Sequence, residues 1–431
     1  PIVQGAEDEV APTYNTEYER TPALFDRTIE PPYGQSPQLA TPEVWKSETA
    51  NGMKVFGITD TELPLVRFSF QMEGGHLLDT PETAGTANLL AEVLTKGTAT
   101  KTPAEFDNEL ALLGADVSVD VNNESFEISG QTLARNFAET IALVEEVMLE
   151  PRWDAEEFAL ARSRTRDAIQ AASARPNTIA TRAFNYVTYG GDSMRALSTL
   201  GSESTLAAIE LEDLKAWRER NLSPHLTSLR IVGDVEEADV IEALNGLTER
   251  WEKVDVALKT SIQPEAPSDS TVYFYDVPGS SQSVFRLGYP ALLRTDADYD
   301  MAGVMNYRLG GGGFASRFMQ ELREGKGYTY GIGSDFFGTE QIGTFSIGSG
   351  IRSNVTLEAA ALTRDIMRDY AATFTEEDLE VTKSFFIKSQ ARAFESLGAK
   401  LNIISDIADY DLPHDFIAQQ LTTVEALTVD D

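Results

Sequence analysis

Two polar side chains interrupt an otherwise apolar stretch, GTANLLAEVLTKGT, at residues 85–98. Asn88 and Glu92 lie four residues apart, so on a helix they project from the same face. Pairs at this spacing on a buried helix often belong to a metal site, but this pair is an amide and a carboxylate with no histidine nearby. Two interpretations follow: a site for a harder ion such as calcium, or polar groups left on a structural helix.

Histidine and cysteine, the usual zinc ligands, are scarce. The chain of 431 residues has no cysteine, which excludes disulfides, thiolate metal sites and cysteine nucleophiles. Its histidines, His76, His225 and His414, are far apart in the sequence, whereas a zinc enzyme usually needs two or three that converge. We therefore interpret them as surface or packing residues. The lack of cysteine also suits an exported protein.

The formal net charge of −34 argues against nucleic acid as a partner, because binding to phosphates requires a basic face. The acidic residues are spread along the whole chain, which favours adaptation to a saline habitat over an acidic cavity that attracts basic substrates. No apolar run approaches the roughly 18 residues of a membrane span. The chain begins with Pro1, so we expect a mature or trimmed form.

Short apolar segments predict an α+β fold in which helices cover one face of an antiparallel-rich sheet. The stretches NGMKVFGIT and LPLVRFSFQMEGG are typical of strands. ADVSVDV and SFEISGQTL, separated by Asn122 and Asn123, indicate a hairpin. NFAETIALVEEVM has the apolar spacing of a helix.

The chain also repeats itself at an offset of 219 to 220 residues, which predicts two copies of one unit. Each copy is expected to run strand, strand, helix, helix, strand, strand, helix, helix. The second copy stops before the counterparts of LTSLRIVGDV and VIEALNGL, so a C-terminal strand and helix are expected to be missing or to lie further along a natural chain. The matched residues are Phe126 with Phe345, Met148 with Met367, and Glu156 with Glu376.

Four regions are predicted from these patterns. Residues 1–45, rich in Pro, Thr and Glu, form an extended arm. Residues 46–252 form the first α+β unit, 253–271 a polar linker, and 272–431 the second unit.

NGMKVFG, VRFSFQMEGG and GTANLLAEVLTKGT together resemble the start of the pitrilysin/insulinase-type zinc peptidases, in the bacterial branch related to mitochondrial processing peptidase. The resemblance covers nearly all of the chain from about residue 46, and it implies the duplicated α+β architecture. Catalytic members carry His-x-x-Glu-His on this helix, with two zinc ligands and a general base, and a distal glutamate as the third ligand.

The resemblance implies a degenerate zinc site in this chain. The ligand positions fall on Asn88 and Glu92, and the general-base position falls on Ala91. The distal ligand falls at Ala168, beside Asp167, which would need a one-residue slip to serve. Alanine cannot move a proton and a single carboxylate does not make a zinc site, so we expect no metal on this chain and no peptidase activity from it alone.

The segment LGGGGFASRFMQELREGKGYTYGIGSDF, residues 309–336, resembles the family's glycine-rich segment, helix and Arg…Tyr element. In two-chain members the zinc and this pair lie on different polypeptides that face one cavity. The pair falls on Arg323, near the end of a helix from about Ser316, and Tyr330, on the following strand. Gly325 and Gly327 would turn the chain between them.

The four glycines Gly310, Gly311, Gly312 and Gly313 are not a phosphate loop, because no Lys-Ser/Thr pair follows and the parallel βαβ context of a dinucleotide motif is absent. A closely packed or mobile segment that borders the cavity is the better interpretation. Substrate contact and hinge motion are its two expected uses.

The resemblance thus implies the non-catalytic subunit of a heterodimeric zinc endopeptidase, in the bacterial periplasm or else the cytoplasm. It would close a chamber around peptides and pair with a homologous zinc-bearing subunit. A structural or peptide-binding member with no role in hydrolysis is the alternative. An independent enzyme is disfavoured, because no Ser/His/Asp or comparable set stands out.

Overall fold

A computed structural model describes residues 24–26, 28–29, 41–390 and 392–431. The chain divides into two compact units, 1–37 and 38–431, and every element named below belongs to the second. Of the predicted arm, 1–45, the structure describes residues 24–26, 28–29 and 41–45, and Trp45, the last of these, begins strand β1 (Trp45–Glu48). In the described ranges, no helix is long and apolar enough to cross a membrane.

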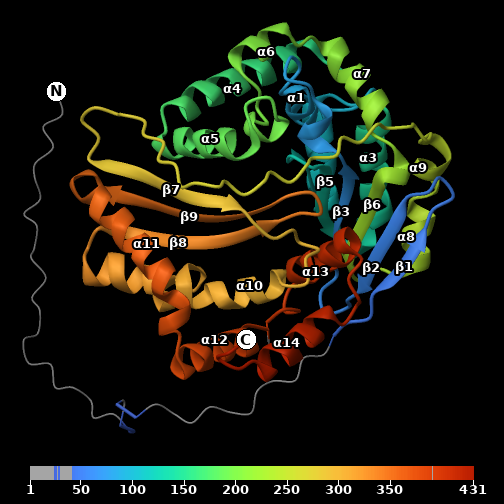
Figure 1. Ribbon diagram of the computed structural model, residues 1–431. Coiled ribbons are helices and arrows are strands. Elements are labelled where there is room, and N and C mark those ends of the chain that lie inside the picture. Colours follow the sequence, from blue (N-terminus) through green and yellow to red (C-terminus); the bar gives the residue numbers. More distant parts are fainter. Residues whose placement is uncertain (1–23, 27, 30–40, 391) are drawn as a thin grey trace, which may run out of the picture. The chain divides into compact units, whose positions relative to one another are not determined.

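The first half of the chain builds a six-stranded sheet (Figure 1). The strand order is β1-β2-β6-β3-β5-β4, and only the β2–β6 pair is parallel. Along β3 the apolar side chains of Phe68 and Phe70 are buried, whereas Arg67 between two buried neighbours is exposed, so one face builds the core. The strands are β1 (Trp45–Glu48), β2 (Lys54–Thr59), β3 (Leu65–Glu73), β4 (Asp116–Val121), β5 (Ser125–Leu133) and β6 (Thr227–Gly233).

Helices cover the apolar face of this sheet, as predicted (Figure 1). The helix that carries Asn88 is α1, and its Leu89, Leu90 and Leu94 are fully buried in the core. Where the sequence predicts one last helix in this half, the structure has two short helices, α8 and α9. The helices are α1 (Thr86–Leu94), α2 (Pro103–Leu113), α3 (Phe137–Leu149), α4 (Ala155–Ser173), α5 (Pro176–Tyr189), α6 (Glu203–Ala208), α7 (Leu211–Asn221), α8 (Glu237–Ala243) and α9 (Asn245–Arg250).

Between the halves, residues 251–281 form neither helix nor strand. The predicted linker, 253–271, falls inside this range, but the strand expected at the start of the second copy is not formed. In the first half, the counterpart of this missing strand is β2, which pairs with β1 on one side and with β6 on the other. In the described second half no strand takes the place of β6, and Val272 and Phe274 are 90% and 84% exposed. The prediction of two strands there is therefore wrong, because the neighbour that would pair with the first of them is missing.

The second half otherwise repeats the first. Its antiparallel sheet has the order β7-β9-β8, which matches β3-β5-β4, and α11 and α12 follow it as α3 and α4 follow β5. The duplication is thus visible in the fold. The elements are β7 (Gln282–Pro290), α10 (Tyr299–Asn306), β8 (Thr329–Gly338), β9 (Gly343–Arg352), α11 (Thr356–Thr373), α12 (Glu376–Gln390), α13 (Leu397–Tyr410) and α14 (Phe416–Ala426).

Helix α13 joins the two halves, because it packs on β6, β3 and β2 of the first sheet. The guanidinium of Arg230 on β6, which is 3% exposed, pairs with the carboxylate of Asp409 on α13. Lys400, also on α13, pairs with Asp60 just after β2. Buried ion pairs of this kind are costly to break from one side, so they hold α13 in register on the sheet.

Candidate functional site

Helix α1 presents Asn88 and Glu92 in different surroundings. Asn88 is partly buried, and its amide nitrogen is buried with no hydrogen-bond partner among the described residues. An N–H₂ group is a donor and cannot bind a cation. Glu92, one turn later, is exposed, and Ala91 is 5% exposed in the core. The helix therefore offers one amide and one surface carboxylate where a zinc helix would offer two histidine ligands and a base.

The distal position lies on α4, which packs against α1. Ala168 there is exposed and has no donor atom, and the carboxylate of Asp167 lies 3.9 Å from its neighbour Arg166. Among the described residues, no group of three or more His, Cys, Asp or Glu side chains could hold a metal ion. The donor set at these four positions does not fit zinc, so no chemistry on this chain is derived through a metal.

The glycine-rich segment is packed tightly against β8. It begins in a π-helical segment, Tyr307–Gly311, in which the N–H of Gly312 donates to the carbonyl of Tyr307 at 2.8 Å. A Cβ at Gly310 would lie 2.7 Å from the backbone nitrogen of Ser334 on β8, so only glycine fits. Gly313 has a φ of 54°, the left-handed region that favours glycine, and it is exposed. π-helical turns of this kind are rare and often lie at functional sites.

Arg323 lies on a second π-helical segment, Met319–Gly325, as expected near the end of the helix that follows the glycines. Its guanidinium carbon is 4.5 Å from the centre of the Phe314 ring, a cation–π contact. Phe314 directly follows Gly313 and is 61% exposed. The glycine-rich segment therefore positions the arginine through an aromatic residue that the sequence reasoning missed. The sequence feature that could have pointed to Phe314 is an aromatic residue directly after four glycines.

Tyr330 lies on β8, as predicted, and its side chain is 87% exposed. The pairing of β8 with β9 shifts register between Thr329 and Ile332, which indicates a bulge, and the hydroxyl of Thr329 accepts a hydrogen bond from the N–H of Gly331. Gly327 turns the chain before this point with a φ of 59°. The bulge leaves Tyr330 in solvent and not in the core. Among the described contacts, no hydrogen bond joins Tyr330 to Arg323.

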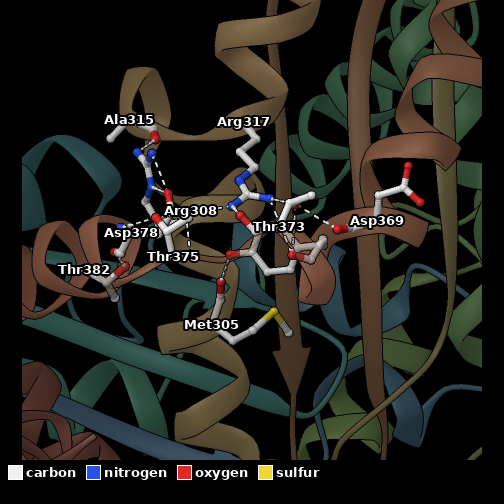
Figure 2. Close-up of polar contacts among 10 residues, drawn as sticks. Met305, Arg308, Ala315, Arg317, Asp369, Thr373, Thr375, Asp378 and Thr382 are labelled. Carbon is white, nitrogen blue, oxygen red and sulfur yellow. Dashed lines mark hydrogen bonds and ion pairs between the residues drawn. The ribbon is translucent and has the colours of Figure 1, made fainter. Parts of the chain in front are cut away.

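A buried carboxylate behind the glycine-rich segment holds this region together. Figure 2 shows Arg308 and Arg317 converging on Asp378, with hydrogen bonds of 2.8 and 2.7 Å to its two oxygens. Burial would raise the pKa of Asp378, but the hydrogen bonds from the two guanidinium groups outweigh it and lower the pKa to about 2. Arg308 also donates to the carbonyl of Ala315, next to Phe314. The Asp378 carboxylate thus supports the segment on which Arg323 stacks.

Two family models match the chain. Residues 56–199 match "Insulinase (Peptidase family M16)", and residues 208–385 match "Peptidase M16 inactive domain". The chain belongs to the M16 peptidase family. The resemblance drawn from the helix and the glycine-rich segment is thereby confirmed, together with the α+β fold of two repeated units.

Some relatives of this M16 chain are named as zinc proteases, and another is named as a non-peptidase homologue. "Uncharacterized zinc protease YmxG" of Bacillus subtilis (strain 168) is 22% identical over 354 residues, 82% of this chain and 85% of that protein. "Non-peptidase homolog YmxG" of Helicobacter pylori (strain ATCC 700392 / 26695) is 21% identical over 373 residues, 85% of this chain and 84% of that protein. The structure of a peptidase M16 inactive domain from Pseudomonas fluorescens has the same fold, with a TM-score of 0.82, 24% identity and coverage of 90% and 92% of the two chains. Because α1 lacks the zinc ligands and the general base, this chain is a non-catalytic M16 member.

Proposed function

We propose that this M16 chain is the non-catalytic subunit of a heterodimeric zinc endopeptidase. It forms half of a chamber for extended peptides, and it contributes Arg323 and Tyr330 to the partner's zinc site. The observation that carries the proposal is the contrast between the two halves. Helix α1 offers no zinc ligand set. The second half, in contrast, contains the guanidinium of Arg323, which is held by a cation–π contact, and the phenol of Tyr330, which is 87% exposed.

The chemistry of peptide hydrolysis explains why these two groups would be kept. Attack on the scissile carbonyl places negative charge on its oxygen, and donors aimed at that oxygen lower the barrier. Arg323 would supply a fixed positive charge, and the Tyr330 hydroxyl a neutral donor. Because Phe314 already orients the guanidinium, little side-chain entropy would be lost when the substrate arrives.

The partner in this proposal is a homologous chain with His-x-x-Glu-His, and its zinc would supply the Lewis acid. Gly311 and Gly313, which are exposed, would lie along the peptide, and the buried Gly310 and the half-buried Gly312 would fix the backbone behind them. We place the assembly in the bacterial periplasm, where a chain without cysteine is not exposed to unwanted thiol oxidation.

Reconstitution tests this proposal. The chain is purified alone, mixed with a zinc-bearing homologue encoded beside it or co-purified with it, and assayed on a fluorogenic peptide. Activity in the mixture that neither chain shows alone supports the proposal. A mixture as inactive as the separate chains contradicts it.

A structural or peptide-binding role with no part in hydrolysis is the second candidate. The cation–π contact between Arg323 and Phe314 favours it, because such a contact stabilises the fold without any substrate. The two candidates differ at Tyr330, which contributes nothing to the core. Tyr330→Phe should lower the activity of the mixture if the first is correct, and it should change nothing if the second is.

A further inference from the structure

A cavity of about 210 Å³ lies where α5 of the first half meets the second sheet. Helix α5 packs against β7, and the guanidinium of Arg286 on β7 donates to the hydroxyl of Thr181 on α5 at 3.1 Å. The wall is completed by the β4–β5 turn and by residues of β8 and β9. Residues that the argument uses are Asn123, Phe184, Asn185, Arg195, Arg286 and Phe337.

The charges on this wall differ from those of the chain as a whole. In a protein of net charge −34, the described cavity wall holds two guanidinium groups and no carboxylate. Arg195, 3% exposed, is neutralised from behind by Glu124 and also donates to Ser261 at 2.8 Å. Arg286 has no ion-pair partner among the described residues. The cavity therefore carries a local charge of one unit positive.

The remaining wall suits the end of a peptide. Asn123 and Asn185 bring amide groups, and the rings of Phe184 and Phe337 bring apolar area; Phe337 is 52% exposed. Burial raises the pKa of Tyr189, which also lines the cavity, so its phenol stays protonated and can donate. Pockets for drug-sized ligands span about 300–1,000 Å³, so this cavity has room for little more than one residue.

We propose that this cavity binds a carboxylate of a peptide, with Arg286 as its charged partner and the free C-terminus as the favoured source. Guanidinium groups recognise carboxylates through paired N–H donors. A single negative charge balances the local charge of the wall, whereas a phosphate monoester, with about −1.5 to −2, would exceed it. This inference rests on the proposed peptide chamber and names how one end of the peptide is held.

The test is a binding assay on the isolated 431-residue chain. Three labelled neutral hexapeptides that end in leucine are compared by fluorescence anisotropy: the free acid, the C-terminal amide, and an amide with aspartate at the penultimate position. The free acid should bind about ten-fold more tightly than the amide, as expected for a charge-assisted contact. If the aspartyl amide binds as tightly as the free acid, the cavity still binds a carboxylate, and a side chain is the source of that carboxylate. Equal binding of all three peptides overturns the proposal.

Variants show whether Arg286 is the cause. Arg286→Gln should remove the preference for the free acid, and Arg286→Lys should keep part of it, because a point charge replaces the paired donors. Arg364→Gln on α11, which makes the same change of charge at a side chain 68% exposed, should leave the preference intact. Retention of the preference in folded Arg286→Gln contradicts the inference. Because the readout is binding and not hydrolysis, its failure is distinguishable from failure of the reconstituted peptidase.

Discussion

Replacement of Asp378 by asparagine tests how the Arg323 region is held. The substitution keeps the shape of the side chain and removes the negative charge between Arg308 and Arg317. The ordinary pKa of this group is 3.8, and in the folded chain it is about 2. A difference of this size corresponds to roughly 2 kcal/mol of stabilisation at neutral pH. The lost counter-charge at Arg308 and Arg317, whose side chains are 14% and 16% exposed, is this same interaction, so we expect a total loss of about 2 kcal/mol.

Urea unfolding measures this loss, and its pH dependence checks the cause. Because the folded pKa is lowered, the stabilisation is fully present above about pH 4 and is lost as the pH falls towards 2. The difference between wild type and Asp378→Asn should therefore shrink by about half at pH 3. Asp365→Asn, at a surface cluster with Arg364 and Arg368, is the matched control and should cost about 0.5 kcal/mol or less. A loss for Asp378→Asn no larger than that of the control, or one that does not change with pH, would refute the reasoning.

Three further predictions concern the same region and α1. Gly310→Ala should destabilise the fold by about 2 kcal/mol in thermal or urea unfolding, because the new Cβ meets the backbone of Ser334; an unchanged midpoint would contradict this packing. Phe314→Ala should lower the activity of the reconstituted pair about two- to five-fold through loss of the cation–π contact with Arg323, and it should cost no more than about 0.5–1 kcal/mol of stability. Metal analysis of the isolated chain should find no stoichiometric zinc, and one zinc per chain would overturn the account of α1.

Much of the fold follows from patterns that are local in the sequence. The hairpin around Asn122 and Asn123, the buried strand β3 and the helices that repeat at a fixed offset all form as predicted. Apolar periodicity decides these elements, because each buries one face whatever its neighbours are. The strand expected near Val272 fails for the opposite reason, since a strand forms only when another strand is there to pair with it.

The elements that carry the candidate residues were predictable from the sequence, whereas the geometry around those residues was not. Arg323 and Tyr330 lie on the predicted helix and strand. The π-helical turns around them depend on tight packing of Gly310 against β8, which no local pattern encodes. Nor does the sequence reveal that Asp378, some sixty residues further on, closes the network behind Phe314. Long-range contacts of this kind decide where a side chain points.

The central claim is that Arg323 and Tyr330 act on the transition state at a partner's zinc. The most direct test is kcat and KM of the reconstituted pair, with wild type, Arg323→Ala and Tyr330→Phe as the non-catalytic subunit. Groups that stabilise the transition state should lower kcat and kcat/KM together, by about ten- to a hundred-fold for each variant, with KM nearly constant. If both variants assemble normally and retain the kcat of wild type, the account is contradicted.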